Sequence, residues 1–267
     1  MRASEFSRLC LAPPLQGTQA RLAPPSFRPL DMHWEAPAPG LLLGLDAEFV
    51  MVSPPEKTFE ANIEVLIRQS RLALARVSVV RGEGRQAGLA CIDDYVKSVE
   101  PVHDYLTRYS GLLPGDLDPA TSRHHLTTSK HAYLKLRYLV DAGCVLVGHG
   151  LKKDLRIINI TVPPEQLVDT VELFSFHRQR KMSLRFLAAF LLGSVIQSSG
   201  HDSIEDARTA LALYEVYKSL VAQGPTALSD KISEMYRWGK QYGWEPSDVA
   251  CLHAGNMSPL LAPLQLP

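Results

Sequence analysis

The sequence predicts an α/β domain that begins near residue 41. From there onward, short runs rich in apolar and β-branched residues alternate with segments of helical periodicity, which is typical of α/β proteins. Turn-forming residues such as Gly143 separate these segments. The chain has 267 residues, 46% of them hydrophobic, so it is long enough to bury a full core.

Three strands are expected before the first long helix. They cover 41–50, 71–81 and 89–96, and an insertion that carries Pro54 and Pro55 separates the first two.

The first long helix is predicted at 127–143, where Leu136 and Val140 belong to an apolar stripe at helical spacing. It ends at Gly143, a residue suited to a helix C-cap. The apolar run CVLVGHG at 144–150 predicts a buried strand directly afterwards. Further helices are predicted at 150–158, 183–192, 203–222 and 226–242.

The two ends of the chain are expected to lie outside this domain. Residues 1–40 contain seven prolines and little periodic apolar pattern, which predicts a flexible proline-rich leader. Residues 246–267 are expected to form a flexible C-terminal tail, so the domain is predicted to cover 41–245.

The overall charge excludes some classes of protein. Lysine and arginine together number 28, and so do aspartate and glutamate, so no bulk positive charge indicates nucleic acid and any such contact must be local. The four cysteines form no CxxC pair, which favours reduced thiols over disulfides or structural zinc. No apolar run approaches the roughly 18 residues of a membrane span, so no membrane contact is expected.

Two acidic residues interrupt the first apolar strand, LLLGLDAEFVMV. Asp46 and Glu48 are two residues apart, so their side chains point to the same face of the strand. Burying two like charges together is costly unless a cation is bound or one carboxyl is protonated. The alternative is that this face of the strand is exposed to solvent.

A third acid follows the buried strand at 144–150. Asp154 falls in the first turns of the next helix, at the carboxyl end of a strand, where open α/β sheets bind ligands. The alternative is that Asp154 only stabilises the helix N-terminus electrostatically.

The segment GHDSIEDARTAL supplies a fourth acid. Asp202 and Glu205 have the spacing of a capping box and are assigned to starting the helix. Asp206 instead shares the apolar stripe of that helix and therefore points toward the protein body, with His201 nearby. A buried aspartate requires a partner, and a metal shared with Asp46 and Glu48 is the candidate.

Three motifs in this chain, DAEF, GHGLKKD and HDSIED, resemble those of the DEDD exonuclease superfamily, in the DEDDh subtype with a histidine five residues before the last aspartate. Longer stretches, among them YLTRYSGLLPGDLDP and HLTTSKHAYLKLRYLVDAG, are similar to the catalytic exonuclease subunits of poly(A) nuclease deadenylation complexes. The resemblance covers roughly 41–245. It implies a ribonuclease-H-like exonuclease fold with a mixed five-stranded sheet flanked by helices.

The resemblance also implies a mechanism with two Mg²⁺ or Mn²⁺ ions, which suit carboxylate oxygen ligands. By similarity, Asp46 bridges both ions, Glu48 and Asp206 hold the ion that binds the attacking water, and Asp154 helps to hold the other. His201 is the expected general base, because imidazole titrates near neutrality.

Substrate contacts are implied less directly. Similar enzymes seat the terminal base and 3′-hydroxyl near Ala47 and Phe49, although Phe49 alternates away from the acidic face and has a core position as its alternative. A basic run between the third and fourth acidic sites is a candidate for backbone-phosphate contact or, alternatively, a solvated loop. Its members are Arg178, Arg180, Lys181 and Arg185.

The function implied is a 3′→5′ exoribonuclease that shortens poly(A) tails and releases 5′-AMP, located in the cytoplasm, with the nucleus and mRNA-processing bodies as further sites. The expected partner is poly(A) RNA. The resemblance also implies a pseudokinase-like regulatory subunit and poly(A)-binding protein as partners of the family, but neither is expected to bind these 267 residues, in which the upstream modules credited with partner binding are not recognised. Two alternatives remain open, a general exonuclease acting on DNA or short oligoribonucleotides and a non-catalytic RNA-binding scaffold.

Overall fold

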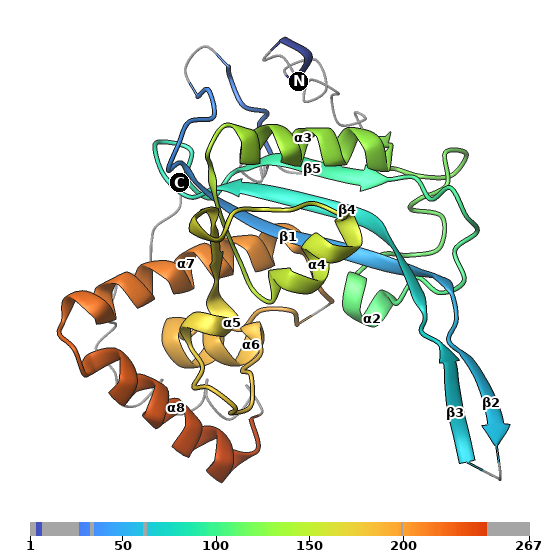
Figure 1. Cartoon of the computed structure of the whole chain (residues 1–267). Coiled ribbons are helices and arrows are strands. Elements are labelled where there is room, and N and C mark those ends of the chain that lie inside the picture. Colours follow the sequence, from blue (N-terminus) through green and yellow to red (C-terminus); the bar gives the residue numbers. More distant parts are fainter. Residues whose placement is uncertain (1–3, 7–26, 33–34, 61–62, 199, 245–267) are drawn as a thin grey trace.

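The computed structural model describes residues 4–6, 27–32, 35–60, 63–198 and 200–244. Its main sheet is centred on β1 (Leu42–Ser53), which pairs antiparallel with β4 (Arg71–Arg81) and parallel with β7 (Val145–Gly148). This arrangement puts the first strand in the middle of the sheet (Figure 1), where both of its faces are covered.

Six strands form this mixed sheet, one more than the five expected, in the order β6-β5-β4-β1-β7-β8. The edges are β5 (Ala90–Val96) with the two-residue β6 (Leu126–Thr127) on one side and β8 (Leu167–Asp169) on the other. Strands of two or three residues are too short to show the alternation by which strands are recognised in a sequence. The predicted α/β class is confirmed, and neither of the two short edge strands, β6 and β8, was located from the sequence.

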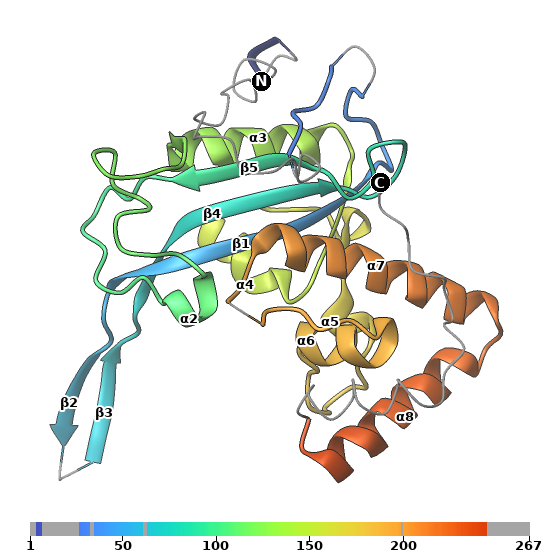
Figure 2. The ribbon, with the colours of Figure 1, turned by 180° about the vertical axis from the view of Figure 1, so that it is seen from behind.

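The insertion around Pro54 and Pro55 is a β-hairpin. Its strands β2 (Glu56–Glu60) and β3 (Ile63–Arg68) pair antiparallel as a separate two-stranded sheet. The hairpin extends away from the main sheet in both views (Figures 1 and 2).

Helices cover both faces of the sheet. On one face, α3 (Ser129–Asp141) and α4 (Leu151–Ile158) pack against the odd-numbered side chains of β1 in one core that includes Leu45 and Leu136. On the opposite face lies α7 (Ser203–Ala222) (Figure 2). Its Ala207 and Leu211 belong to a second apolar cluster. The predicted helices are thus found within a few residues of their expected ends.

A further core lies beyond the edge of the sheet. There α8 (Ala227–Tyr242) packs with the second half of α7, with α6 (Leu184–Leu187) and with the π-helical turn η2 (Ala188–Leu192) that continues α6. The remaining short helices are α2 (Thr107–Ser110), η1 (Pro164–Gln166) and α5 (Thr170–Leu173).

Some residues before position 41 contact the domain. The ring of Phe6 is fully buried and stacks on Tyr138 of α3, and Phe27 forms a parallel bridge with Ala90 of β5. Residues 1–3, 7–26 and 33–34 of the predicted leader and the predicted tail at 246–267 lie outside the described residues. Within the described part of the chain, no helix has the length and apolar character needed to cross a membrane.

Candidate active site

Asp46 and Glu48 lie on the face of β1 that α7 covers. Alternation places them on the same side as Gly44, and a Cβ at Gly44 would lie only 2.7 Å from the backbone oxygen of Ala207 in α7. Glu48 is 5% exposed, so the exposed-face alternative for this strand is excluded. Two carboxyl groups therefore share a covered interface between sheet and helix.

The protonation of these two groups reflects that environment. The pKa of Asp46 is raised well above its ordinary value by burial and by the nearby charges of Glu48, Asp206 and Asp154. Burial, followed by the charge of Asp206, raises the pKa of Glu48 to about 8, although Arg76 opposes the shift. Without a cation, the site thus retains protons that these acids would release in water.

Asp154 joins the same electrostatic cluster from α4. The helix starts after Gly150, which adopts φ +80, and Gly150 donates its backbone N–H to Asp169 across 2.8 Å. Burial raises the pKa of Asp154 to about 7, partly offset by Lys153. The tight turn after β7 therefore directs a third carboxyl group toward the site.

Asp206 and His201 complete the cluster from the start of α7. Asp206 is 4% exposed, its Oδ2 lies 3.3 Å from Nδ1 of His201, and it accepts a hydrogen bond of 2.8 Å from the Gln197 side chain. Ligand atoms of Glu48, His201 and Asp206 all lie within 4.8 Å of one another. Four acids and a histidine that are far apart in the sequence thus converge.

Two buried carboxylate oxygens in this cluster have no hydrogen-bond partner among the described residues. They are Oε1 of Glu48 and Oδ1 of Asp206. A buried, unpaired carboxylate oxygen is costly, and a hard divalent cation with oxygen ligands removes that cost. The donor set present therefore fits a divalent metal ion.

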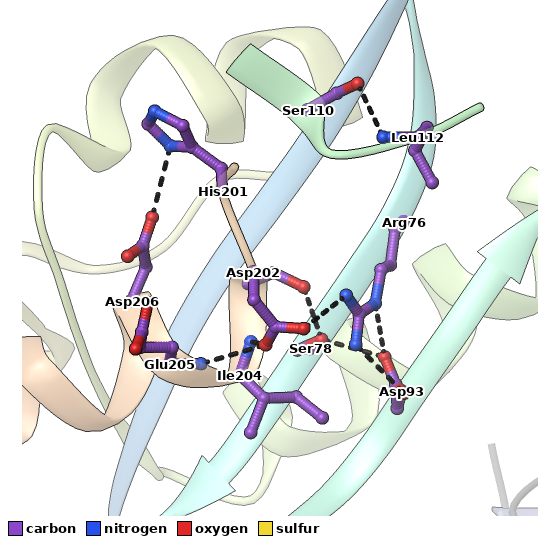
Figure 3. A network of polar contacts seen from close by, with 11 residues as sticks. Arg76, Ser78, Asp93, Ser110, Leu112, His201, Asp202, Ile204, Glu205 and Asp206 are labelled. Atoms are coloured by element: carbon purple, nitrogen blue, oxygen red, sulfur yellow. Dashed lines mark hydrogen bonds and ion pairs between the residues drawn. The ribbon is translucent and has the colours of Figure 1, made fainter. Parts of the chain in front are cut away.

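A buried arginine lies beside the acids and was not predicted from the sequence as a residue of the site. Arg76 of β4 is opposite Glu48 in the strand register, and its Nη1 donates to Asp202 across 3.1 Å (Figure 3). The RVSVVR segment carried a usable signal, because Arg76 and Ser78 interrupt a buried strand at period two. The acidic cluster thus has a basic neighbour, although the pKa of Glu48 is still raised.

Other polar residues near the site have structural roles. Asp202 caps α7 as predicted, accepting hydrogen bonds from the backbone of Ile204 and Glu205. Glu205 does not complete a capping box in the described contacts and accepts instead from the backbone of Gln197 across 3.0 Å. His149 is hydrogen-bonded to Thr170 across 2.9 Å, and its burial lowers its pKa to about 4.

The predicted contacts to the terminal nucleotide, Ala47 and Phe49, are on β1 but on its other face. Ala47 is buried in the core formed with α3 and α4, and Phe49 is half-buried against the same core. Pairing of β1 with β4 shifts register between Glu48 and Phe49. A substrate contact by either residue stays a prediction.

The predicted basic run lies between α5 and α6. Arg178 is exposed, Arg180 lies 5.3 Å from the ring centre of Trp244, and Lys181 pairs with Glu172 across 2.7 Å. Arg185, in α6, is only partly exposed. Neither Arg178 nor Arg185 has a charged or aromatic partner among the described contacts, and phosphate binding by the run stays a prediction.

A cleft of about 540 Å³ opens beside His201. Arg76, Asp93, Asp202 and Arg208 contribute to its walls together with Gly111. The imidazole is thus reached from solvent, while Asp206 lies beneath it.

Comparison with known proteins identifies the family to which the chain is similar. The exonuclease family model (RNase_T) matches residues 43–214. The PAN2-PAN3 deadenylation complex catalytic subunit pan2 of Schizosaccharomyces pombe is 51% identical over 216 residues, which are 80% of this chain and 20% of that protein. PAN2 of Homo sapiens, a subunit of the same description, is 47% identical over 223 residues, covering 82% of this chain and 18% of that protein. The chain thus spans about a fifth of the length of these relatives.

Solved structures agree with this comparison. The Neurospora crassa Pan2 catalytic unit (protease and nuclease domain) superposes with a TM-score of 0.70 at 40% identity, covering 86% of this chain and 34% of that one. The Saccharomyces cerevisiae Pan2 pseudoubiquitin hydrolase-RNA exonuclease module in complex with A7 RNA gives a TM-score of 0.71 at 42% identity, covering 82% and 35%. These similarities confirm the ribonuclease-H-like fold. Since the matched segment 43–214 contains all four converging acids and His201, the chain belongs to the exonuclease (RNase_T) family.

Proposed function

We propose that this chain is a 3′→5′ exoribonuclease that shortens poly(A) tails, uses two Mg²⁺ or Mn²⁺ ions and releases 5′-AMP. Membership of the exonuclease family implies the use of divalent metal ions. The observation that carries the proposal is the convergence of Asp46, Glu48, Asp154, Asp206 and His201, with two carboxylate oxygens left unpaired.

The residues have separate tasks in this proposal. Asp46, Glu48, Asp154 and Asp206 hold the ions, which when bound neutralise negative charge developing on the scissile phosphate. His201 has its Nδ1 edge toward Asp206, so its Nε2 is the atom that accepts the proton of the attacking water. Water adds to phosphorus, the bond to the 3′-oxygen breaks, and that oxygen takes a proton as the mononucleotide leaves.

The preference for poly(A) is supported by the relatives. The S. pombe and human proteins are named as catalytic subunits of deadenylation complexes, and the structure of the S. cerevisiae module is described in complex with A7 RNA. We propose poly(A) RNA as the partner of this chain. The names of the S. pombe and human relatives also include PAN3. We propose that binding to such a subunit depends on regions of those relatives outside the fifth of their length that this chain matches.

The test is degradation of oligo(A), oligo(U) and oligo(dA) carrying a 5′ label, with Mg²⁺ or with EDTA. We expect stepwise shortening from the 3′ end, fastest on oligo(A) and absent in EDTA. His201→Ala should lower turnover by roughly 10²- to 10⁴-fold while Mg²⁺ still raises the melting temperature. The exposed helix residue Asp230 provides a matched control, since Asp230→Asn should leave the rate unchanged.

Two outcomes would support the alternatives. Equal rates of degradation on the three substrates would contradict a preference for poly(A) and would support a general exonuclease. If Mg²⁺ raises the melting temperature of the protein but none of the three substrates is degraded, the remaining alternative is a non-catalytic RNA-binding scaffold.

A further inference from the structure

The start of α7 brings three residues of the site together. His201 precedes the cap, Asp202 is the cap, and Asp206 lies in the first turns of the helix. Oδ1 of Asp202 accepts from the backbone of Ile204 and Glu205 across 2.9 and 3.1 Å. Its other oxygen, Oδ2, accepts from Nη1 of Arg76 across 3.1 Å. One carboxylate therefore joins the helix start to the sheet.

Arg76 is itself held in one orientation. Its side chain is 9% exposed, and Nε and Nη2 donate to the two oxygens of Asp93 across 2.8 and 3.2 Å. Its guanidinium carbon lies 4.9 Å from the ring centre of Tyr95. A bidentate carboxylate and an aromatic face together fix the plane of the guanidinium, which a lysine could not match.

A second contact runs parallel to the first. The hydroxyl groups of Ser78 and Ser203 lie 2.7 Å apart. Ser78 also donates to Asp93 across 2.9 Å (Figure 3). Both contacts begin on β4, at the residues opposite Glu48 and Asp46 in the strand register. The sheet positions that face the acids of β1 are thus the positions that hold the start of α7.

We propose that Arg76 is a positioning residue: through Asp202 it sets the start of α7, and with it His201 and Asp206, relative to the acids of β1. The inference rests on the proposed hydrolytic function, because it concerns the geometry of that site. Arg76 makes no direct contact with Asp206 or His201 among the described hydrogen bonds and ion pairs, so its effect on these two residues passes through Asp202. Arg76 also lies opposite Glu48 in the strand register, and Asp202→Asn removes the link to α7 while it leaves that arginine in place.

Loss of this contact should act mainly on the chemical step. A displacement of catalytic groups by about 1 Å can lower turnover by roughly 10²-fold. Arg76→Gln should therefore lower kcat by about that factor, with a smaller change in KM, because Arg76 is only one of the residues that line the cleft beside His201. Arg76→Lys should give an intermediate loss, because one ammonium cannot bond Asp93 as a fork and also reach Asp202.

The experiment compares Arg76→Gln, Asp202→Asn and the double variant with the wild type. Asparagine still caps a helix, so Asp202→Asn removes the ion pair and keeps the cap; it also serves if Arg76→Gln does not fold. The two single losses in kcat should be similar, and the double variant should lose no more than either. Hydrogen exchange of the Ile204 and Glu205 amides should be faster in each variant, a readout that requires no activity.

Arg81→Gln is the matched control, because Arg81 is also a buried arginine of β4 but bonds to residues 28–35 instead of α7. It should lower the melting temperature without changing kcat or exchange at the start of α7. Any of three results would overturn the proposal. The losses in kcat of the two single variants could multiply in the double variant, hydrogen exchange at Ile204 and Glu205 could stay unchanged, or Arg81→Gln could lose as much kcat as Arg76→Gln. A wild type that degrades no RNA would refute the proposed function, while the exchange data would still decide whether Arg76 positions α7.

Discussion

Individual carboxyl groups determine how this site responds to pH. In the absence of metal, the pKa values of Asp46, Glu48 and Asp154 are all raised, with Glu48 at about 8 and Asp154 at about 7. The folded protein therefore holds more protons than the unfolded chain between about pH 4 and pH 8, where unfolded acids have already ionised. Their contribution to stability is complete at low pH and is lost as the pH rises through these values.

We accordingly predict that the metal-free protein becomes less stable by on the order of a few kcal/mol between pH 5 and pH 8, and that Mg²⁺ reduces this loss. Urea unfolding in EDTA and in millimolar Mg²⁺ at several pH values measures both effects. His149, with its pKa lowered to about 4, contributes in the opposite direction below about pH 6.5.

Glu48→Gln separates the two contributions. Glutamine fills the same space without titrating, so this variant should show a shallower pH dependence in EDTA and a weaker response to Mg²⁺. The same pH dependence in the wild type and in Glu48→Gln would remove Glu48 from the coupled cluster.

The sequence was sufficient to predict which way a side chain points where only the periodicity of its own strand or helix decides it. Alternation along 41–50 places Asp46 and Glu48 on one face, and the stripe of 203–222 turns Asp206 inward, so both predictions needed only local periodicity. The contact of Arg76 with Asp202 joins residues 126 apart in the chain, and no local pattern predicts which strand a helix start will meet. Strand β6 was missed because two residues cannot show alternation.

The packing of α7 on β1 depends on a glycine. A Cβ at Gly44 would lie 2.7 Å from the Ala207 backbone oxygen and 2.8 Å from Cδ1 of Leu211. We predict that Gly44→Ala lowers the free energy of unfolding by about 1–3 kcal/mol, because β1 and α7 must move apart to make room for the added methyl group. Since α7 carries Asp206, the Mg²⁺-dependent rise in melting temperature should also shrink. Urea unfolding and a Mg²⁺ thermal titration measure the two effects.

Leu211→Ala tests the cause of that cost. Removing the leucine side chain relieves part of the contact, so the double variant should be more stable than the sum of the two single losses implies. Additive losses would mean that the strain does not arise between Gly44 and Leu211.

At the scale of the whole molecule, the site is assembled from three parts that meet at the centre of the sheet. The acids of β1, the turn after β7 and the start of α7 each bring one portion, and separate apolar clusters hold α4 and α7 on opposite faces. The second half of α7 belongs to another core with α8. The helix therefore links the acidic cluster to a part of the protein that contributes none of the four acids.

Residues before position 41 also belong to this assembly. Arg81, which is 4% exposed, donates to the backbone oxygens of Arg28 and Pro29 across 2.8 and 3.1 Å and to Glu35 across 2.9 Å. A charged donor that loses its buried partners costs about 1–3 kcal/mol or more. The boundary predicted at residue 41 would remove these three acceptors and leave Arg81 with the longer bonds to the backbone oxygens of Leu89 and Ala90, at 3.5 and 3.4 Å.

We therefore predict that a chain beginning at residue 41 is less stable than the full chain by about 1–3 kcal/mol, measured by urea unfolding. Arg81→Leu should have opposite effects in the two backgrounds. In the full chain it leaves three acceptors without a donor and destabilises, whereas in the shortened chain it removes a poorly paired buried charge and is neutral or stabilising. The Mg²⁺-dependent rise in melting temperature should persist after shortening, because Asp46, Glu48, Asp154 and Asp206 all remain. Equal stability of the two chains would show that residues 27–35 contribute nothing to the domain, and that it begins at residue 41 as the sequence predicts.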